Sequence, residues 1–378
     1  MKKILVIHNN YQIQGGEDIA VLNEVKLLKE QYKVETLFFD NRISNYITQF
    51  FYFLINNNLE SNKALKSKLK SFNPDIVYIH NTWFKGSIGI FKILRNKNYK
   101  VFIKLHNFRY KCTKSYLKSR HFKSIQYCNA CGLRPDEMRF FNKYYKESYL
   151  KSFLVIRHSK QLLKFLSDEK FNILVLTEFH KKYLQKNQIS KNVSIFPNHL
   201  NALESRNIKS ENYIVYAGRI SDEKGINELI QAFIRVNLDG FKLKIIGDGP
   251  LLKELKRKYT DKRILFLGQL TNFETIDQIK FSKGVVTATK LLEGQPTLLC
   301  EASTLFKPSV FPDTGGIKEF FPNEYKLAFK QYDYQDLESK LRIFANNEEV
   351  ERIGNDNHKF IKDLLDKKKL LNQFENLQ

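Results

Sequence analysis

The sequence lacks long apolar runs, and cysteine, tryptophan and methionine are rare in it. Its 378 residues include four cysteines, one tryptophan and two methionines. No apolar run approaches the roughly 18 residues that a membrane-spanning helix needs. The chain starts with basic residues, but the apolar residues that follow are too few for a secretory signal peptide. These absences predict a cytoplasmic protein without a membrane span, in which structural disulfides are not expected.

The few cysteines are compatible with a small metal site. Cys128 and Cys131 have the spacing of a metal knuckle, and Cys112 with His121 or His106 could complete four ligands. The second cysteine pair that makes such a pattern specific is missing. A loop with free thiols is therefore the favoured alternative to a structural metal site at Cys112, Cys128 and Cys131.

Positive charge is concentrated in the first half of the chain. Residues 1–200 contain 35 lysines and arginines against 14 acidic residues, a net charge of +21, whereas residues 201–378 have a net charge of +2. Such a basic half attracts an anionic partner: phospholipid head groups, a lipid-linked pyrophosphate, an acidic polysaccharide or nucleic acid. A lysine-rich composition that only keeps the protein soluble is the alternative.

Length and composition predict two globular domains. A chain of 378 residues with 42% hydrophobic and 27% charged residues is too long for one ordinary core and too apolar for wholesale disorder. The polar stretch 200–212 has no periodicity and marks a linker. In both halves, short apolar strands alternate with polar or glycine-containing loops and helices. This alternation predicts an α/β fold of two doubly wound, Rossmann-like domains that face each other across a cleft.

Polar residues at the ends of predicted strands form the candidate site of the first half. Parallel strands present ligand-binding groups at their carboxyl ends. One strand ends in His80–Asn81 and the next in His106, with Arg109 close behind it. The strands predicted in this half span residues 4–7, 34–39, 75–80, 101–105, 171–177 and 193–196.

A glycine pair follows the first of these strands. Gly15 and Gly16 stand between that strand and a helix, a layout that points backbone N–H groups at a phosphate. The three spaced glycines of the dinucleotide fingerprint are missing, so a nicotinamide site is not predicted.

The segment 45–56 is unusually aromatic and precedes a cluster of lysines, Lys63, Lys66, Lys68 and Lys70. Aromatic residues beside such a cluster can enter a membrane interface. They can equally form a helix that packs on the sheet. The sequence does not decide between these two interpretations.

A pair of glutamates dominates the second half, whose strands are predicted over residues 213–217, 243–246, 264–267, 284–288 and 309–311. Glu293 and Glu301 are separated by a turn in which Pro296 has the place of a first helical residue. At about 1.5 Å of rise per helical residue they can lie roughly 10 Å apart, close to the length of a sugar nucleotide. We interpret them as groups that hold two hydroxyl-bearing parts of one ligand, with the backbone N–H groups of Gly294 and Gln295 between them. A solvated helix face is the alternative.

Arg219 and Lys224 flank a loop at the same predicted sheet edge. Both cations suit the oxyanions of a diphosphate. Breaking the bond between a sugar carbon and a diphosphate leaves extra negative charge on the phosphate, which must be stabilised as it appears. Many enzymes hold a divalent cation there with an Asp-x-Asp pair, but this sequence has none. We therefore expect Arg219, Lys224 and nearby helix ends to stabilise this charge without a metal or other cofactor.

The order of these motifs resembles the second half of the family-four retaining glycosyltransferases, which have the two-domain GT-B fold. The first half resembles that family more loosely, and Gln295 stands where many members have an aromatic residue. The motifs that carry the resemblance are Tyr216–Arg219, Glu223–Gly225, Gly247–Pro250 and Glu293–Glu301, and in the first half Gly15–Glu17, His80–Asn81 and Leu105–Asn107.

The resemblance implies a role for several candidate residues. The implied catalytic set is His106 beside the reacting carbon, Arg219 and Lys224 on the donor diphosphate, and Glu293 on a hydroxyl of the donor sugar. The resemblance further implies Glu301 on the ribose and the Gly16 backbone against the phosphate or sugar. The predicted donor-binding set also includes Gly15, Gly247, Gly249, Gly294 and Gln295. Acceptor binding is assigned to His80, Asn81 and Arg109.

The linker predicts the domain limits, and the resemblance implies that the end of the chain returns to the first domain. Residues 1–199 would form an acceptor-binding domain and residues 200–354 a nucleotide-sugar-binding domain. Residues 355–378 would cross back to the first domain.

Together these features predict a metal-independent glycosyltransferase of surface polysaccharide synthesis, of the lipopolysaccharide or capsule type. It would move a hexose-type sugar from a UDP-sugar or GDP-sugar to an anionic lipid-linked or polysaccharide acceptor, with peripheral contact to the inner face of the cytoplasmic membrane. Retention follows from the resemblance alone, and no protein base is assigned. A nucleotide-sugar epimerase of similar fold is the alternative. A basic nucleic-acid-binding protein would leave the glutamates unexplained, and no nucleic-acid module is recognisable.

Overall fold

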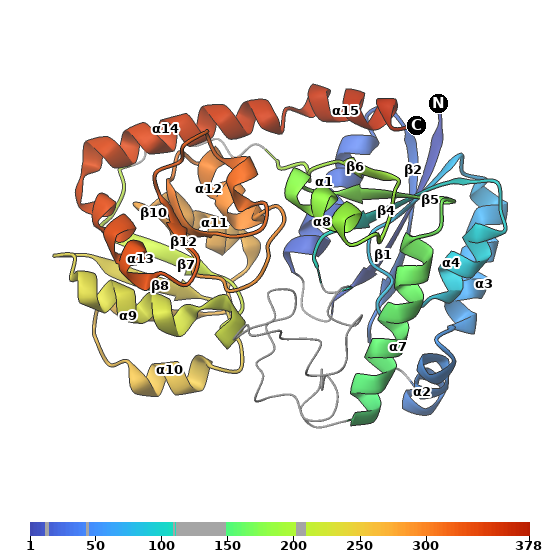
Figure 1. Cartoon of the computed structure of the whole chain (residues 1–378), viewed down its shortest axis with the longest axis horizontal. Helices are drawn as coiled ribbons and strands as arrows, with labels where there is room; N and C mark the ends of the chain where they lie inside the picture. The colour runs from blue at the N-terminus through green and yellow to red at the C-terminus, as the bar shows by residue number, and fades with distance from the viewer. Residues whose placement is uncertain (12–14, 43–44, 109, 111–148, 202–208) are drawn as a thin grey trace. The chain divides into compact units, whose positions relative to one another are not determined.

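The protein forms two compact units, each built on one six-stranded parallel sheet (Figure 1). The first unit consists of residues 1–199 and 365–378, and the second of residues 200–364. The α/β class and the two doubly wound sheets confirm the predicted fold class. The computed structural model describes residues 1–11, 15–42, 45–108, 110, 149–201 and 209–378.

The first sheet has the strand order β2-β1-β3-β4-β5-β6, and all of its pairs are parallel. Its strands are β1 (Lys3–Asn10), β2 (Lys33–Asp40), β3 (Ile76–Ile79), β4 (Lys100–Leu105), β5 (Phe171–Val175) and β6 (Val193–Ile195). The helices of this unit are α1 (Gly16–Leu28), α2 (Tyr46–Ile55), α3 (Leu59–Phe72), α4 (Gly89–Arg95), α7 (Tyr149–Leu166), α8 (Glu178–Lys186) and α15 (Lys367–Asn376).

The central strands of this sheet are apolar on both faces. A strand covered by helices on both sides reads as a continuous apolar run instead of an alternating one, and β1 and β3 do so. Leu5 and Ile7 of β1 pack into one core, whereas Ile4 and Val6 pack into a second core on the opposite face. This arrangement explains why the strands were recognisable in the sequence.

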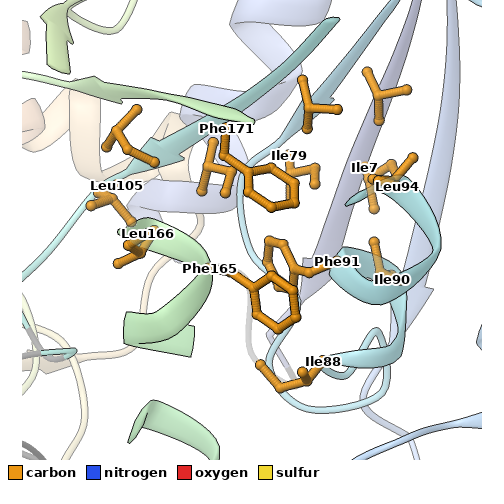
Figure 2. Packing of buried hydrophobic residues seen from close by; sticks show 14 of the residues in the cluster. Ile7, Ile79, Ile88, Ile90, Phe91, Leu94, Leu105, Phe165, Leu166 and Phe171 are labelled. Atoms are coloured by element: carbon orange, nitrogen blue, oxygen red, sulfur yellow. The ribbon is translucent and has the colours of Figure 1, made fainter. Parts of the chain in front are cut away.

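The first of these cores lies between the sheet and the helices α3, α4, α7 and α8. Phe91 of α4 stacks on Phe165 of α7 with ring centroids 5.5 Å apart, and Phe171 of β5 meets both rings edge-on (Figure 2). All three side chains are buried. Replacing a buried phenylalanine by alanine costs about 3 to 5 kcal/mol, so this aromatic cluster fixes the helices to the sheet.

The second core holds the end of the chain. Phe374 of α15 is fully buried and its ring lies 5.4 to 5.9 Å from those of Tyr32, Tyr78, Phe102 and Phe196. The last helix therefore belongs to the first unit, whereas the preceding helix, α14 (Asn347–Leu364), belongs to the second.

The second sheet has the strand order β12-β11-β10-β7-β8-β9, again all parallel. Its strands are β7 (Tyr213–Ala217), β8 (Lys242–Ile246), β9 (Ile264–Gly268), β10 (Gly284–Val286), β11 (Ser309–Asp313) and β12 (Ala328–Lys330). Its helices are η2 (Asp222–Lys224), α9 (Ile226–Val236), α10 (Leu252–Lys258), α11 (Asn272–Lys280), α12 (Thr297–Thr304), η3 (Ile317–Phe320), α13 (Tyr334–Leu341), η4 (Arg342–Ala345) and α14.

Every strand expected from the sequence is present, with ends that differ by up to three residues. The additional strand, β12, is only three residues long, and its sequence Ala-Phe-Lys carries no pattern that marks a strand. No helix in the described part of the chain is both long and apolar enough to cross a membrane.

Candidate functional site

The second sheet changes direction between β7 and β10. From β7 the chain moves outward through β8 and β9, and it then returns to the other side of β7 to place β10, β11 and β12. At such a point the connections from two neighbouring strands run to opposite faces of the sheet, which leaves a crevice at the carboxyl ends of these strands. Doubly wound sheets bind their ligands in this crevice. The loops that follow β7 and β10 are therefore the site of this unit.

An ion pair joins these two loops. Lys224, at the end of η2 after β7, places its Nζ 2.5 Å from Oε1 of Glu293, which follows β10. Each side chain is 29% exposed, so the pair is partly desolvated but still open to solvent. The ammonium has three donors, and one bond to Glu293 leaves donors that an anion can use.

Only one oxygen of the Glu293 carboxylate, Oε1, accepts hydrogen bonds from described residues. The hydroxyl of Thr289 donates to the same Oε1 over 3.1 Å, and the Glu293 carbonyl accepts a hydrogen bond from the N–H of Gly316 over 2.9 Å. Among the described residues none donates to Oε2. This geometry fixes the carboxylate and leaves one oxygen able to accept a hydroxyl of a ligand. Thr289 carried no signal in the sequence, because its role depends on the fold of the loop.

Close backbone packing sets the position of Lys224. Gly225 has φ of +65°, and a Cβ at this residue would lie 2.0 Å from the carbonyl oxygen of Ala288. The N–H of Lys290 donates to the carbonyl of Glu223 over 2.9 Å. The loops after β7 and β10 thus touch through backbone atoms at Gly225, a contact that only glycine permits.

A second close contact supports Arg219. A Cβ on Gly247, where φ is +131°, would lie 2.0 Å from the carbonyl oxygen of Gly218, and one on Gly249 would lie 2.3 Å from that of Ile220. The loop after β8 therefore packs directly under the loop that carries Arg219. The Arg219 carbonyl accepts a hydrogen bond from the Tyr216 hydroxyl over 2.9 Å, while the Arg219 residue itself is exposed. Gly247 and Gly249 act here as spacers between two loops.

A buried lysine beneath the site was not predicted. Nζ of Lys290 lies 2.7 Å from Glu228 and 3.3 Å from Asp222, and its side chain is only 3% exposed. Asp222 opens η2 and Glu228 lies in α9, so Lys290 ties the loop after β10 to both elements that follow β7. Its position four residues after a strand was the only feature in the sequence that could have indicated this role. A lone lysine in a loop is usually a surface residue, so the feature is not specific.

Glu301 lies apart from this ion pair, in the second turn of α12. Pro296 precedes the first helical residue, Thr297, and the adjacent Gly294 and Gln295 are buried. Glu301 is almost completely buried, and burial raises the pKa of its carboxyl to about 7, against a hydrogen bond with Asn272 that lowers it. A carboxyl with this pKa changes charge near neutral pH, and a ligand that donates hydrogen bonds to it favours the ionised form.

In the first unit, the glycine loop is anchored by a buried hydrogen bond between His8 and Asp18. The Asp18 carboxylate lies 2.8 Å from Nε2 of His8 in β1 and accepts a hydrogen bond from the N–H of Gly15 over 2.8 Å. Burial alone would raise the pKa of Asp18, but these hydrogen bonds lower it below its usual value. Gly16 is exposed, and a Cβ there would meet no atom within 4 Å. His8 follows the same strand-end rule as His80 and could have been found by it.

His80 and His106 are brought together by neighbouring strands. Nδ1 of His80 lies 3.0 Å from Nε2 of His106, and the rings stack with centroids 5.3 Å apart. Burial, followed by the positive charge of Lys104, lowers the pKa of His106 well below its usual value, and burial also lowers that of His80. Both imidazoles are therefore neutral at pH 7. Asn81 uses its side chain to hold its own loop, accepting the N–H of Trp83 over 2.8 Å.

Four candidate residues cannot be placed. Arg109 and the proposed metal ligands Cys112, Cys128 and Cys131 lie outside the described residues. Within the described part of the chain, no group of three or more His, Cys, Asp or Glu side chains has the arrangement of a metal site.

The comparison with protein families covers the second unit. Residues 201–363 match the family model described as glycosyl transferases group 1. The amylovoran biosynthesis glycosyltransferase AmsD of Erwinia amylovora is 29% identical over 147 residues, 36% of this chain and 42% of the relative. The capsular polysaccharide biosynthesis glycosyltransferase CapM of Staphylococcus aureus is 29% identical over 170 residues, 42% of this chain and 44% of the relative. These matches span less than half of the relatives' length.

Likeness in structure extends over both units. The Anabaena protein HepE, solved in complex with UDP and glucose, superposes with a TM-score of 0.68 over 100% of this chain and 99% of its own, at 14% sequence identity. At this identity the likeness shows the fold alone, and the fold is the GT-B arrangement of two Rossmann-like units. Residues 201–363 therefore form a domain of the glycosyl transferases group 1 type, and both units together have the fold of glycosyltransferases of known structure.

Proposed function

We propose that the protein transfers a hexose-type sugar from a nucleotide diphosphate sugar to a lipid-linked oligosaccharide or polysaccharide acceptor, with retention of the anomeric configuration. The single observation that carries this proposal is the Lys224–Glu293 pair at the switch point of the second sheet, inside the family domain. It offers a cation for phosphate and a carboxylate for a sugar hydroxyl within one hydrogen-bonded unit.

The diphosphate would lie against Lys224 and Arg219. As the sugar leaves, negative charge builds on the outer phosphate, and fixed cations stabilise it without reorganisation. Exposed Arg219 and the remaining donors of Lys224 suit this task. The absence of an Asp-x-Asp pair from the sequence favours a mechanism that needs no divalent cation.

The remaining groups would orient the donor and the reacting centre. Glu293 accepts a sugar hydroxyl through Oε2, Glu301 accepts the ribose hydroxyls, and Gly16 leaves room for the donor beside its backbone. Neutral His106 would lie beside the reacting carbon as a hydrogen-bond donor or acceptor. The departing phosphate would guide the incoming hydroxyl onto the same face, so no protein base is needed.

The relatives support an acceptor from surface polysaccharide synthesis. AmsD and CapM are described as glycosyltransferases of amylovoran and capsular polysaccharide biosynthesis, and HepE was solved with UDP and glucose. The net charge of +21 on residues 1–200 suits an anionic acceptor at the inner face of the cytoplasmic membrane. We propose a UDP-sugar or GDP-sugar as donor.

A panel of uridine, guanosine and adenosine diphosphate sugars tests the proposal. We expect one sugar nucleotide to raise the melting temperature of the protein, because a ligand that binds only the folded state stabilises it. The same compound should transfer its sugar to a lipid-linked acceptor without added magnesium or manganese. Complete loss of transfer on chelation would contradict the metal-free mechanism but not the transfer itself.

Two outcomes would contradict the transfer reaction. Incubation with the donor alone that yields an isomeric sugar nucleotide would identify an epimerase. Tight oligonucleotide binding with a steep salt dependence, and no stabilisation by any sugar nucleotide, would identify a nucleic-acid-binding protein.

A further inference from the structure

The first unit exposes an apolar helix face that no described residue covers. Ile47, Phe50, Phe51 and Ile55 lie on one side of α2, at helical spacing, and are 72%, 43%, 58% and 50% exposed. Leu59, at the start of α3, continues this surface and is 56% exposed. A soluble monomer rarely exposes a contiguous group of large apolar side chains without a binding role. We call these five residues the apolar face.

The opposite side of α2 explains why the helix is firmly placed. The ring of Phe53 lies 5.3 Å from that of Trp83 and 6.1 Å from that of Phe84. The Asn56 side chain, at the end of α2, hydrogen-bonds to Gln161 and His158 of α7, which lies beside it (Figure 1). The apolar face is therefore the outer side of a well-packed helix.

The exposed apolar surface extends onto α7. Tyr149, Leu150 and Phe153, in its first turns, are 43%, 50% and 55% exposed. One turn after Phe153, the Arg157 guanidinium donates to the carbonyl of Leu54 in α2. Of the thirteen large apolar side chains that are exposed in the described part of the chain, eight belong to the apolar face or to this part of α7. The concentration is local, so general surface composition does not explain it.

Charge indicates which partner covers the apolar face. Helix α2 has no charged residue, and Lys63, Lys66 and Lys70 follow Leu59 at positions i+4, i+7 and i+11 along one exposed side of α3. None of these three lysines forms an ion pair with a described residue. Apolar and aromatic side chains beside a row of unpaired lysines suit a bilayer of anionic lipid, whose negative surface attracts each lysine that lies close to it.

We propose that the apolar face is a membrane-docking surface, in which α2 lies in the head-group region of an anionic bilayer and the lysine row of α3 contacts lipid phosphates. The binding needs no donor or acceptor sugar, so it does not depend on the proposed transfer reaction. For residues 45–56, where the sequence left two interpretations open, α2 packs on the unit with one side and leaves the other side exposed for the proposed contact.

Vesicle binding of the full chain tests this proposal. The protein should co-sediment with vesicles of phosphatidylglycerol and phosphatidylcholine and bind vesicles of phosphatidylcholine alone less strongly. The variant F50S/F51S should reduce the partition coefficient by more than about tenfold, since both rings leave the interface. The control F273S changes a phenylalanine of α11 in the second unit that is 82% exposed, and it should bind like the wild type.

Trp83 provides a second readout. It is the single tryptophan of the chain and contacts Phe53 of α2, so its emission should shift when α2 meets lipid. The variant K63Q/K66Q/K70Q should lose the preference for phosphatidylglycerol, whereas K253Q/K256Q, on exposed positions of α10, should keep it. Unchanged melting temperatures and donor binding would show that these variants remain folded.

Two results would overturn the proposal. One is equal vesicle binding by the wild type and F50S/F51S. The other is a dimer in the absence of lipid that F50S/F51S dissociates, because the apolar face would then be an interface between two copies of the chain.

Discussion

The carboxyl edges of the two sheets carry different chemistry. In the first unit, His80 is buried and His106 is half-buried; the two are hydrogen-bonded to each other and neutral. In the second unit, the edge carries the Lys224–Glu293 ion pair, which is open to solvent. One edge can offer uncharged hydrogen bonds, and the other can neutralise an anion.

This difference runs against the distribution of net charge. Residues 1–200 carry a net charge of +21 but place neutral imidazoles at their sheet edge. Residues 201–378 carry only +2 and present the Lys224–Glu293 ion pair of the family domain. Exposed lysines of the first half lie instead on outer helix faces, such as Lys63, Lys66 and Lys70 on α3. In the proposed function, net charge would attract the anionic acceptor to the first unit, and local geometry would hold the donor diphosphate in the second.

Alanine in place of glycine should change the stability of the protein in opposite directions in the glycine loops of the two units. Gly225→Ala places a Cβ 2.0 Å from the Ala288 carbonyl oxygen at a positive φ, so we expect the free energy of unfolding to fall by about 3 kcal/mol or more. Gly16→Ala adds a Cβ in open space at the start of α1 and should leave stability unchanged or raise it by about 0.5 to 1 kcal/mol. Chemical denaturation measures both.

The same Gly16→Ala variant tests the donor contact. Its turnover should fall although its fold is intact, because the methyl group would occupy space that the donor needs. Normal turnover in Gly16→Ala would show that Gly16 does not contact the donor. The roles proposed for Lys224 and Glu293 in the second unit would not be affected by this result.

Removing either member of the ion pair should slow turnover by more than tenfold, which corresponds to at least about 1.4 kcal/mol of transition-state stabilisation. Lys224→Ala removes the cation, and Glu293→Gln replaces the carboxylate by an amide that binds a hydroxyl more weakly. Steady-state kinetics with the identified donor, together with melting temperatures, separate this effect from unfolding.

A matched control for Glu293→Gln lies on the other side of the same unit. Oε1 of Glu338, in α13, lies 2.5 Å from Nε of Arg235 in α9, the same distance as in the Lys224–Glu293 pair. Glu338→Gln should keep turnover near that of the wild type. If it slows the reaction as much as Glu293→Gln does, the effect of Glu293→Gln is one of stability and not of chemistry.

Donor affinity should depend on pH through Glu301. In the free protein the pKa of this carboxyl is about 7, and ribose hydroxyls that donate to the carboxylate would lower it in the complex. Binding then releases a proton, so the dissociation constant should rise by about tenfold between pH 8 and pH 6 and stay level above pH 8. Calorimetry in buffers of different ionisation enthalpy measures the released proton. In Glu301→Gln this pH dependence should disappear.

The sequence predicted the fold better than the positions of side chains. Strands such as β1 and β7 are near-continuous apolar runs, because helices cover both faces of a parallel sheet. The pairing of Lys224 with Glu293 could not be predicted in the same way, since it depends on two loops that touch at Gly225 and Ala288, 63 residues apart. Thr289 and Lys290 were missed for this reason: threonine and lysine in a loop have no signature until the loop has a shape.

The smallest expected effect concerns the histidine pair. Nε2 of His80 is buried without a hydrogen-bond partner among the described residues, and a bare lone pair there costs less than an unpaired N–H. His80 therefore carries its proton on Nδ1 and donates it to Nε2 of His106, which places the His106 proton on Nδ1.

The variant His80→Phe keeps a ring between Tyr78 and His106 but removes this hydrogen-bond donor. The nitrogen chemical shifts of His106 should report one tautomer in the wild type and a mixture of two tautomers in the variant. Turnover should fall by only a few fold, with donor affinity unchanged, because His106 would still be present but less well ordered. A single, unaltered tautomer in His80→Phe would show that His106 is oriented by other groups.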